Sequence, residues 1–321
     1  MNTTNVPCIW AISSLGADVN PPMNTALTST PLPCTRSEEG IVSIHLATTD
    51  RPVVILDMAL LRKLETTLEA IHAASRETPL RGVVLRSDCT RVFVAGADLV
   101  EIDGLDDQDL LHYLAEGSRI LSMIATLPCP TVAAVDGATL GGGLEIAMHC
   151  DALIATRTSG SGKPYPIGLP ECSLGLCPGW GGTQMLPARI DPSTAIRMTT
   201  SGVAATSEDI PEGLVDRFVD DSGELAAACR EWIEASETPD RSSGTPRCLD
   251  QKHPGTIQAA IEHARGELED TAETRAVLDC LEIGLRDGWN AAIEAEQNHL
   301  VSLRGSESTR KKLDAFFSKQ R

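Results

Sequence analysis

Three consecutive glycines, Gly141-Gly142-Gly143, are the sequence feature that most restricts the fold of this chain. They follow the apolar run 131–135, which predicts a buried strand, and precede the apolar-periodic stretch 144–150, which predicts a helix. Each glycine costs backbone entropy on folding, so a simple turn is a poor reason for three in succession. N–H groups at the start of a helix lack intrahelical acceptors, and they suit an oxygen that gains negative charge during a reaction.

Two glutamates near glycines are candidates for acid–base chemistry. Glu145 lies within the first turn of the predicted helix, so its carboxylate is expected close to the glycine N–H groups. A helix-dipole or capping role explains this glutamate as well as a catalytic role does. Glu171 follows the loop Gly168-Leu169-Pro170, and alone it is an ordinary loop carboxylate. Paired across a fold, the two glutamates can supply an acid and a base.

A third candidate loop runs through Ala95-Gly96-Ala97-Asp98-Leu99, where an apolar strand end breaks at Gly96. Its small residues allow the N–H of Ala97 to point into a pocket. A strand-to-helix turn with Asp98 as N-cap explains the segment equally well. No GxSxG nucleophile elbow, zinc-binding HExxH or dinucleotide-binding GxGxxG pattern occurs, so neither metal nor nicotinamide chemistry is expected.

Strand-like and helix-like segments recur along the chain. Apolar runs or alternation predict strands at 41–47, 83–85, 131–135 and 152–155. Helical spacing predicts helices at 60–74, 106–127, 144–150, 256–268, 270–300 and 306–318. The repeated strand, strand, helix order predicts an α/β core of stacked repeats rather than a sandwich or a bundle.

These patterns divide the chain into four parts. Residues 1–37 are rich in Thr, Asn, Pro and Ser and are expected to be a disordered extension, followed by an α/β core at 38–235. A linker is expected at 236–256 and a helical module at 257–321. Because Met23-Asn24-Thr25 repeats the opening Met1-Asn2-Thr3, a natural start at Met23 is a further hypothesis.

Composition excludes several classes of protein. The formal net charge of −18 argues against a nucleic-acid partner and against tight contact with an anionic membrane surface. No apolar run approaches the roughly 20 residues of a membrane span, and no secretory signal pattern occurs. The 10 cysteines are scattered without a CxxC pair, which indicates reduced cytosolic thiols rather than disulfides or structural zinc. A cytoplasmic protein is expected.

Together the three loops resemble the enoyl-CoA hydratase/isomerase (crotonase) superfamily. The likeness covers roughly residues 39–218, and its pieces stand in the right order: 95–98, 134–137, 141–145, 150–151, 168–171 and 175–184. Residues 274–318, including Glu294-Ala295-Glu296, resemble the helical segment that closes the hydratase half of bifunctional fatty-acid oxidation proteins. The resemblance implies a crotonase-like stacked ββα superhelix with a C-terminal helical module.

The same resemblance implies roles for particular residues. Glu145 and Glu171 match the two catalytic glutamates of the hydratases, and the N–H groups of Ala97 and Gly142 match an oxyanion hole. The residues implied to contact the substrate are Ala95, Gly96, Asp98, Leu99, Gly141, Pro170 and Gly179. The implied reaction adds water to a 2-enoyl-CoA and gives a 3-hydroxyacyl-CoA, as in fatty acid β-oxidation. Coenzyme A enters as part of the substrate, so no separate cofactor or metal is expected.

Three functions remain open from the sequence. Isomerases need only one base, so the presence of both glutamates favours hydration over an enoyl-CoA isomerase or another thioester-enolate reaction. A non-catalytic acyl-CoA-binding subunit that partners a separate dehydrogenase is an alternative of another class. Members of the resembled family form trimers or pairs of trimers, so a homo-oligomer is expected unless the C-terminal helices cover that surface.

Overall fold

A computed structural model of the chain describes residues 30–47, 53–251 and 254–320. Most of the predicted extension, with the hypothesis of a start at Met23, lies outside these residues. The prediction that the disordered extension continues to residue 37 is wrong. Residues 34–36 form the strand β1 (Cys34–Arg36), which pairs antiparallel with β2 (Ile41–Leu46). A strand of three residues is too short to show alternation in its sequence, and backbone hydrogen bonds to β2 hold it in the sheet.

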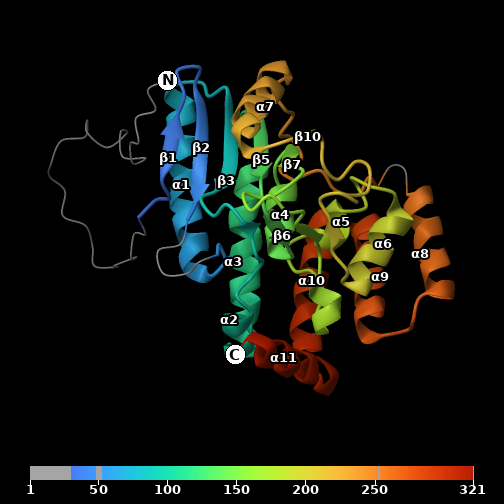
Figure 1. Ribbon diagram of the computed structural model, residues 1–321. Helices are drawn as coiled ribbons and strands as arrows, with labels where there is room; N and C mark the ends of the chain where they lie inside the picture. Colours follow the sequence, from blue (N-terminus) through green and yellow to red (C-terminus); the bar gives the residue numbers. More distant parts are fainter. Residues whose placement is uncertain (1–29, 48–52, 252–253, 321) are drawn as a thin grey trace, which may run out of the picture.

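Three consecutive strand–strand–helix units build the core (Figure 1). The first comprises β3 (Gly82–Ser87), β4 (Val92–Val94), α2 (Leu99–Gly104) and α3 (Asp107–Ala125). The second comprises β5 (Thr131–Val135), β6 (Ala138–Leu140) and α4 (Gly142–Met148). The third comprises β7 (Ala152–Thr156), β8 (Pro166–Gly168), the 3-10 helix η1 (Glu171–Leu174) and α5 (Gly182–Met185).

The two strands of each unit enter different sheets. The first strands join a six-stranded sheet of order β1-β2-β3-β5-β7-β10, which ends at β10 (Arg217–Val219). The second strands join a four-stranded sheet of order β4-β6-β8-β9, which ends at β9 (Ala205–Thr206). This arrangement confirms the predicted α/β class and its stacked ββα core.

Both faces of the large sheet are buried, which explains the continuous apolar runs of its strands. Its strands from β2 to β10 are parallel. Along β3, Val83 and Leu85 enter the main core, whereas Val84 faces the opposite side. On that opposite side α7 (Ser222–Ala235) covers the sheet, and α1 (Met58–Glu77), α3 and α4 lie on the main-core side (Figure 1).

Aspartate side chains define where the long helices of this core begin. Asp57 precedes α1, and its Oδ1 accepts a hydrogen bond from the N–H of Leu60 at 2.8 Å. Asp106 precedes α3 and accepts from the N–H of Asp109 at 2.8 Å. Each carboxylate satisfies an N–H that has no intrahelical acceptor. The predicted helices at 60–74 and 106–127 are therefore confirmed with slightly shifted ends.

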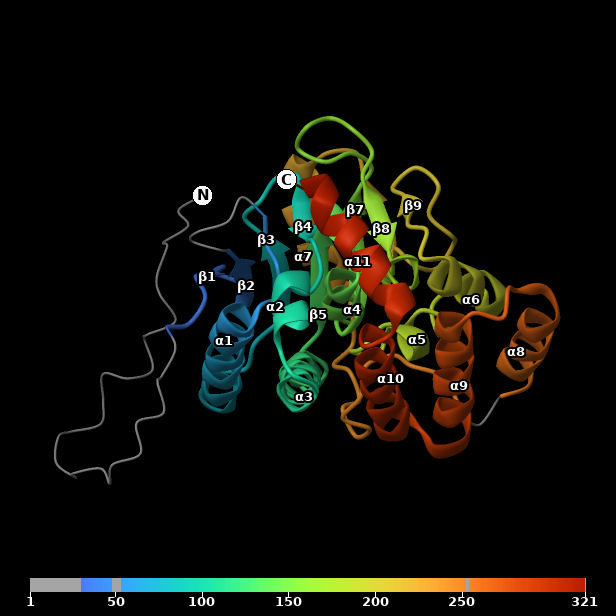
Figure 2. The same ribbon diagram turned by 90° about the horizontal axis from the view of Figure 1, so that it is seen from below.

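The C-terminal helices lie beside the sheets and pack against α3, α5 and η1 (Figure 2). They are α6 (Pro192–Ser201), α8 (Gly255–Glu267), α9 (Ala272–Asp287), α10 (Trp289–Arg304) and α11 (Glu307–Gln320). The prediction of one helical stretch over 270–300 is wrong at Gly288, whose φ of +88° ends α9 and starts α10. A positive φ is incompatible with a continuous right-handed helix.

The stretch between α7 and α8 has no helix or strand over 236–251, as expected of a linker, but it is anchored to the core. The guanidinium of Arg241 donates to both carboxylate oxygens of Asp151, at 2.7 and 2.8 Å. It also donates to the carbonyls of Leu127 at 2.8 Å and Cys129 at 2.9 Å. A single residue, Arg241, donates all of these hydrogen bonds. A sequence pattern that depends on several regularly spaced residues therefore cannot predict this anchor.

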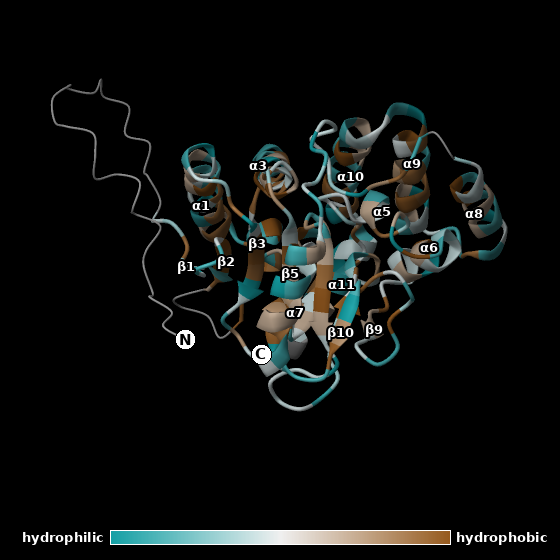
Figure 3. Ribbon diagram, turned by 90° about the horizontal axis from the view of Figure 1, so that it is seen from above, coloured by the Kyte–Doolittle hydropathy of each residue, from teal (hydrophilic) through white to brown (hydrophobic). Residues whose placement is uncertain are grey.

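Apolar residues gather along the strands and the inward sides of the helices, while loops and outer surfaces are polar (Figure 3). The large buried side chains are mostly aliphatic, with Trp180, Tyr113, Phe93 and Tyr165 as aromatic exceptions. Among the helices in the described ranges, none combines the length and apolarity that crossing a bilayer requires.

Replacing Arg241 with methionine tests the anchor of the linker. The variant removes the cation that pairs with Asp151 and the donor to two carbonyls, while Asp151 keeps its hydrogen bonds from Thr131. We therefore expect the free energy of unfolding to fall by about 1–3 kcal/mol. Denaturant titration followed by circular dichroism measures the change. As a control, Arg217→Met breaks an exposed ion pair with Glu231 and should cost less than about 1 kcal/mol. Equal losses in the two variants would contradict a special role for Arg241.

Candidate active site

The candidate site forms where three neighbouring parallel strands of the small sheet end. The loops that follow β4, β6 and β8 contain the three segments singled out in the sequence. The carboxyl ends of parallel strands lie along one edge of a sheet, which brings these loops together. The site is therefore a direct product of the ββα repeat.

Glu145 on α4 points into the interior and is only 2% exposed. Its Oε1 accepts hydrogen bonds from the N–H groups of Trp180 and Gly182, both at 2.8 Å. Burial raises the pKa of Glu145 well above its usual value, the negative charges of Glu171 and Glu296 raise it further, and the two N–H donors oppose the change. Glu145 is thus held in place by backbone donors in an environment that favours its protonated form.

Glu171, the first residue of η1, lies against the start of α4. A β-carbon added to Gly141 would stand 2.6 Å from Oε1 of Glu171. Burial raises the pKa of Glu171 to about 7, with a smaller contribution from the charge of Glu296. Its Oε2 is buried and has no hydrogen-bond partner within the described part of the chain. A buried polar atom of this kind marks a position for water or a ligand group.

The loop that contains Ala97 meets the start of α4. A β-carbon added to Gly96, whose φ is +110°, would stand 3.1 Å from the carbonyl oxygen of Leu140 and 4.0 Å from the nitrogen of Gly142. Gly142 is the first residue of α4, so its N–H has no acceptor within the helix. The structure brings Ala97 and Gly142 to one place, and their role as an oxyanion hole stays a prediction.

Each of the glycines 141–143 lies so close to a neighbouring group that a β-carbon at its position would collide with that group. At Gly141 the neighbour is Glu171, and the φ of +55° with ψ of −126° also favours glycine. A β-carbon on Gly142 would stand 2.6 Å from the ring of Trp180, and one on Gly143 would stand 2.2 Å from the carbonyl oxygen of Val94. The three glycines therefore serve close packing and the site together.

The remaining residues expected to bind substrate lie in these loops, at the start of α2 or, for Gly179, between η1 and α5, and their contact with a substrate stays a prediction. The N–H of Ala95 donates to the carbonyl of Val54 at 2.8 Å, and Asp98 caps α2 through the N–H of Val100 at 2.9 Å. Leu99 begins α2 and Pro170 precedes η1. Gly179 packs between Leu114 and Leu300.

Trp180 is a site residue that the sequence interpretation missed. Besides its N–H bond to Glu145, its ring covers Gly142 and lies 5.6 Å, between centroids, from the ring of Tyr113. Its Nε1 donates to the carbonyl of Leu114 at 3.0 Å. In the sequence, Trp180 stands between glycines, which indicates that the backbone there is closely packed. This pattern does not indicate that Trp180 contacts Glu145 and Gly142.

Glu296 on α10 is the second residue that the sequence interpretation missed. It is 0% exposed, and its carboxylate accepts from the N–H groups of Gly181 at 2.6 Å and Thr183 at 2.9 Å. Burial raises the pKa of Glu296 to about 7. A signal was available, because Glu296 stands in the apolar stripe of its helix, at the spacing of Ile293, Leu300 and Leu303.

His149, at the end of α4, belongs to the helix rather than to a triad or a metal site. Its Nδ1 donates to the carbonyl oxygen of Glu145 at 2.9 Å, as a residue at the end of a helix can. Burial lowers the pKa of His149 to about 4, so the ring is neutral near neutral pH. Within the described residues, no group of three or more His, Cys, Asp and Glu side chains is arranged to hold a metal ion.

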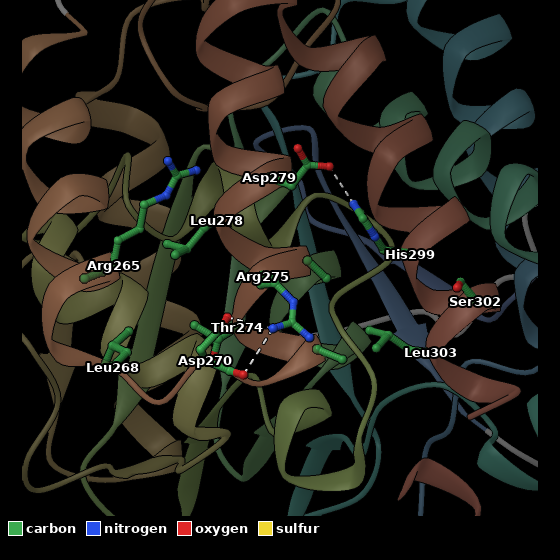
Figure 4. Close-up of a pocket in the computed structure, with 13 residues that line it drawn as sticks. Arg265, Leu268, Asp270, Thr274, Arg275, Leu278, Asp279, His299, Ser302 and Leu303 are labelled. Atoms are coloured by element: carbon green, nitrogen blue, oxygen red, sulfur yellow. Dashed lines mark hydrogen bonds and ion pairs between the residues drawn. The ribbon is translucent and has the colours of Figure 1, made fainter. Parts of the chain in front are cut away.

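A separate pocket of about 690 Å³ lies among α8, α9 and α10 (Figure 4). Its charged lining includes two ion pairs, Arg275 with Asp270 at 2.8 Å and His299 with Asp279 at 2.7 Å. None of the candidate site residues described above lines it. This pocket is therefore distinct from the glutamate site.

The raised pKa of Glu171 predicts how stability depends on pH. A glutamate whose folded pKa lies above its unfolded value stabilises the fold at low pH, and this contribution is lost as the pH rises through the folded pKa. We expect the melting temperature to fall between about pH 5 and pH 8, and to fall less in Glu171→Gln, which cannot ionise. Calorimetry over this range measures it. Glu234→Gln, on the exposed side of α7, should keep the wild-type slope, and an unchanged slope in Glu171→Gln would contradict the raised pKa.

Comparison with known proteins adds independent information to this geometry. Residues 37–243 match the family model described as enoyl-CoA hydratase/isomerase. The chain is 31% identical over 268 residues to a fatty acid oxidation complex subunit alpha from Idiomarina loihiensis, covering 80% of this chain and 36% of that protein. It is 30% identical over 237 residues to human mitochondrial methylglutaconyl-CoA hydratase, covering 71% and 67% of the two chains.

A solved structure of an enoyl-CoA hydratase has the same fold as this chain. The crystal structure of an enoyl-CoA hydratase from Bacillus anthracis superposes with a TM-score of 0.56 at 25% identity, over 89% of this chain and 95% of that one. The chain spans only 36% to 40% of the length of the fatty acid oxidation subunits that it matches. By its sequence and its ββα fold, this chain belongs to the enoyl-CoA hydratase/isomerase family.

Proposed function

We propose that the protein adds water to the double bond of a 2-enoyl-CoA and gives a 3-hydroxyacyl-CoA. The observation that carries this proposal is the pair of buried carboxyl groups, Glu145 and Glu171, at the start of one helix. Burial raises the pKa of both groups, so near neutral pH one can hold a proton while the other is ionised. Hydration requires this combination, since one group removes a proton from water and the other delivers a proton to the α-carbon.

The backbone N–H groups of Ala97 and Gly142 complete the proposed mechanism. As the water oxygen bonds to the β-carbon, the electrons of the double bond move towards the thioester, whose oxygen gains negative charge. Two fixed donors can stabilise this enolate, and a single such donor is typically worth about 3–4 kcal/mol. The α-carbon then takes the proton of the protonated carboxyl group, which leaves the hydrated thioester.

The named relatives support hydration and extend the proposal. One is called a methylglutaconyl-CoA hydratase and another a fatty acid oxidation complex subunit alpha. The word complex in the second name fits an assembly with a separate dehydrogenase, which together with a homo-oligomer remains part of the proposal. No cofactor beyond the coenzyme A of the substrate is proposed. A cytoplasmic location is supported by the cysteines of the described residues, which are free thiols.

Absorbance of crotonyl-CoA, a short conjugated enoyl thioester, tests the proposal. Hydration removes the conjugation, so the ultraviolet absorbance should fall on addition of the protein. We expect Glu145→Gln and Glu171→Gln each to lower kcat by about 10²- to 10⁴-fold, the usual contribution of a general acid or base. Glu234→Gln is the matched control for the chemical change and should keep the wild-type rate.

The outcomes separate the competing functions. Conversion of a 3-enoyl-CoA to a 2-enoyl-CoA, with no hydration and with only one of the two glutamates required, would assign an isomerase. Binding of the thioester in calorimetry, without turnover of either substrate, would assign a binding subunit. Either result would overturn the hydratase proposal.

A further inference from the structure

We propose that Glu296 is a positioning residue for Glu145, acting through the backbone of residues 180–183. This inference rests on the proposed function, because Glu145 is the carboxylate whose position matters for the reaction. It gives a role in the chemistry to α10, a helix of the C-terminal region that is far from Glu145 in the sequence.

The N–H groups of residues 180–183 alternate between two buried carboxylates. Those of Trp180 and Gly182 donate to Oε1 of Glu145, both at 2.8 Å. Those of Gly181 and Thr183 donate to Oε2 and Oε1 of Glu296, at 2.6 and 2.9 Å. The hydroxyl of Thr183 also donates to Glu296, at 2.5 Å. One short segment therefore joins the two carboxylates, and a displacement at Glu296 moves the donors of Glu145.

The backbone of residues 180–183 is closely packed and hydrogen-bonded, so it has little freedom to move. Gly181 has a φ of +101°, and a β-carbon on it would stand 2.3 Å from the ring of Trp289. Gln184, just beyond the segment, donates from Nε2 to the hydroxyl of Thr183 at 2.8 Å and to the carbonyl of Cys280 at 2.9 Å. The segment is held by α9 and α10 together, so the donors of Glu145 cannot shift without moving these helices.

A packing role alone does not explain a carboxylate at position 296. Its side chain is 0% exposed, and no cation pairs with it within the described part of the chain. Burying a carboxylate without a cation is costly, and an apolar side chain would fill the same place on the helix more favourably. The carboxylate of Glu296 instead accepts three hydrogen bonds, two from backbone N–H groups and one from a hydroxyl, which matches a group that fixes the backbone.

The charge of Glu296 also reaches both candidate catalytic groups. The pKa of Glu145 is raised most by burial, next by the charge of Glu171 and then by the charge of Glu296. The charge of Glu296 also contributes, less than burial, to the raised pKa of Glu171. The titratable groups that face it are Glu145 on α4, Glu171 on η1, Cys177 before α5 and Cys280 on α9. Other charged groups of α10 and its neighbours form pairs of their own: His299 with Asp279, Arg304 with Asp107, and Lys312 with Glu273.

Glu296→Gln tests the proposal, because it keeps the size of the side chain and removes its charge. The amide nitrogen of glutamine cannot accept a hydrogen bond, so either Gly181 or Thr183 loses its acceptor. We expect kcat for crotonyl-CoA to fall about 10- to 100-fold, as for a small misplacement of a reacting group, with KM changed less than about 3-fold. Loss of the charge lowers the pKa of Glu145 and Glu171, so the pH profile of kcat should move towards acid.

Two further variants separate charge from position. Glu294→Gln, exposed on the same helix, is the matched control and should keep the wild-type kcat and pH profile. Glu296→Asp keeps the charge but is shorter, so it should restore the pH profile without restoring kcat. A wild-type kcat and pH profile in Glu296→Gln would overturn the proposal. If this variant does not fold, Thr183→Val, which removes one donor to Glu296, should still lower kcat about 3- to 10-fold with KM unchanged, and no loss would overturn the proposal.

Infrared spectra keep this test independent of the proposed function. The C=O stretch of protonated buried carboxyl groups is followed while the pH is raised, without any substrate. In Glu296→Gln the remaining bands should disappear at lower pH than in the wild type, and an unchanged titration would overturn the inference. A wild type that does not hydrate crotonyl-CoA, but shows this shift, would count against the proposed function alone.

Discussion

Hydrogen bonds from the backbone of residues 180–183 to two buried carboxylates are the interaction on which the site depends. Glu145 and Glu296 are both removed from water, and each would be costly to bury without donors. Four consecutive N–H groups supply most of those donors. Burial raises the pKa of Glu296 to about 7, and its hydrogen-bond donors oppose the change. The pKa of Glu145 is likewise raised by burial and by the charges of Glu171 and Glu296, and lowered by its two backbone donors.

The C-terminal helices are part of this arrangement rather than an attachment to it. α10 supplies Glu296, and α9 receives a hydrogen bond from Gln184. α11 lies across η1, where the hydroxyl of Thr309 donates to the carbonyl of Gly175 at 2.7 Å. The segment that carries Glu171 is therefore covered by a helix from the end of the chain. Stability of the helical layer and geometry of the site are coupled through these contacts.

The ββα repeat explains why the remaining site residues come together. In each unit the first strand enters the large sheet and the second enters the small one, so three equivalent loops follow adjacent parallel strands. The same position in each repeat then carries a different part of the site: Ala97 after β4, Gly142 after β6 and Glu171 after β8. Small residues in these loops let them approach each other at backbone distance, as the contact of Gly143 with Val94 shows.

The sequence by itself determined the fold class, most strands and helices, and the loops that carry Glu145 and Glu171. It could do so because buried parallel strands leave apolar runs and close approaches leave glycines, both of which are local patterns. Only the tertiary structure decided that Glu171 reaches Gly141, that Trp180 and Glu296 join the site, that Arg241 anchors the linker, and that β1 extends the sheet. These contacts join segments far apart in the chain, and their partners depend on sheet register and helix placement, which no local pattern records.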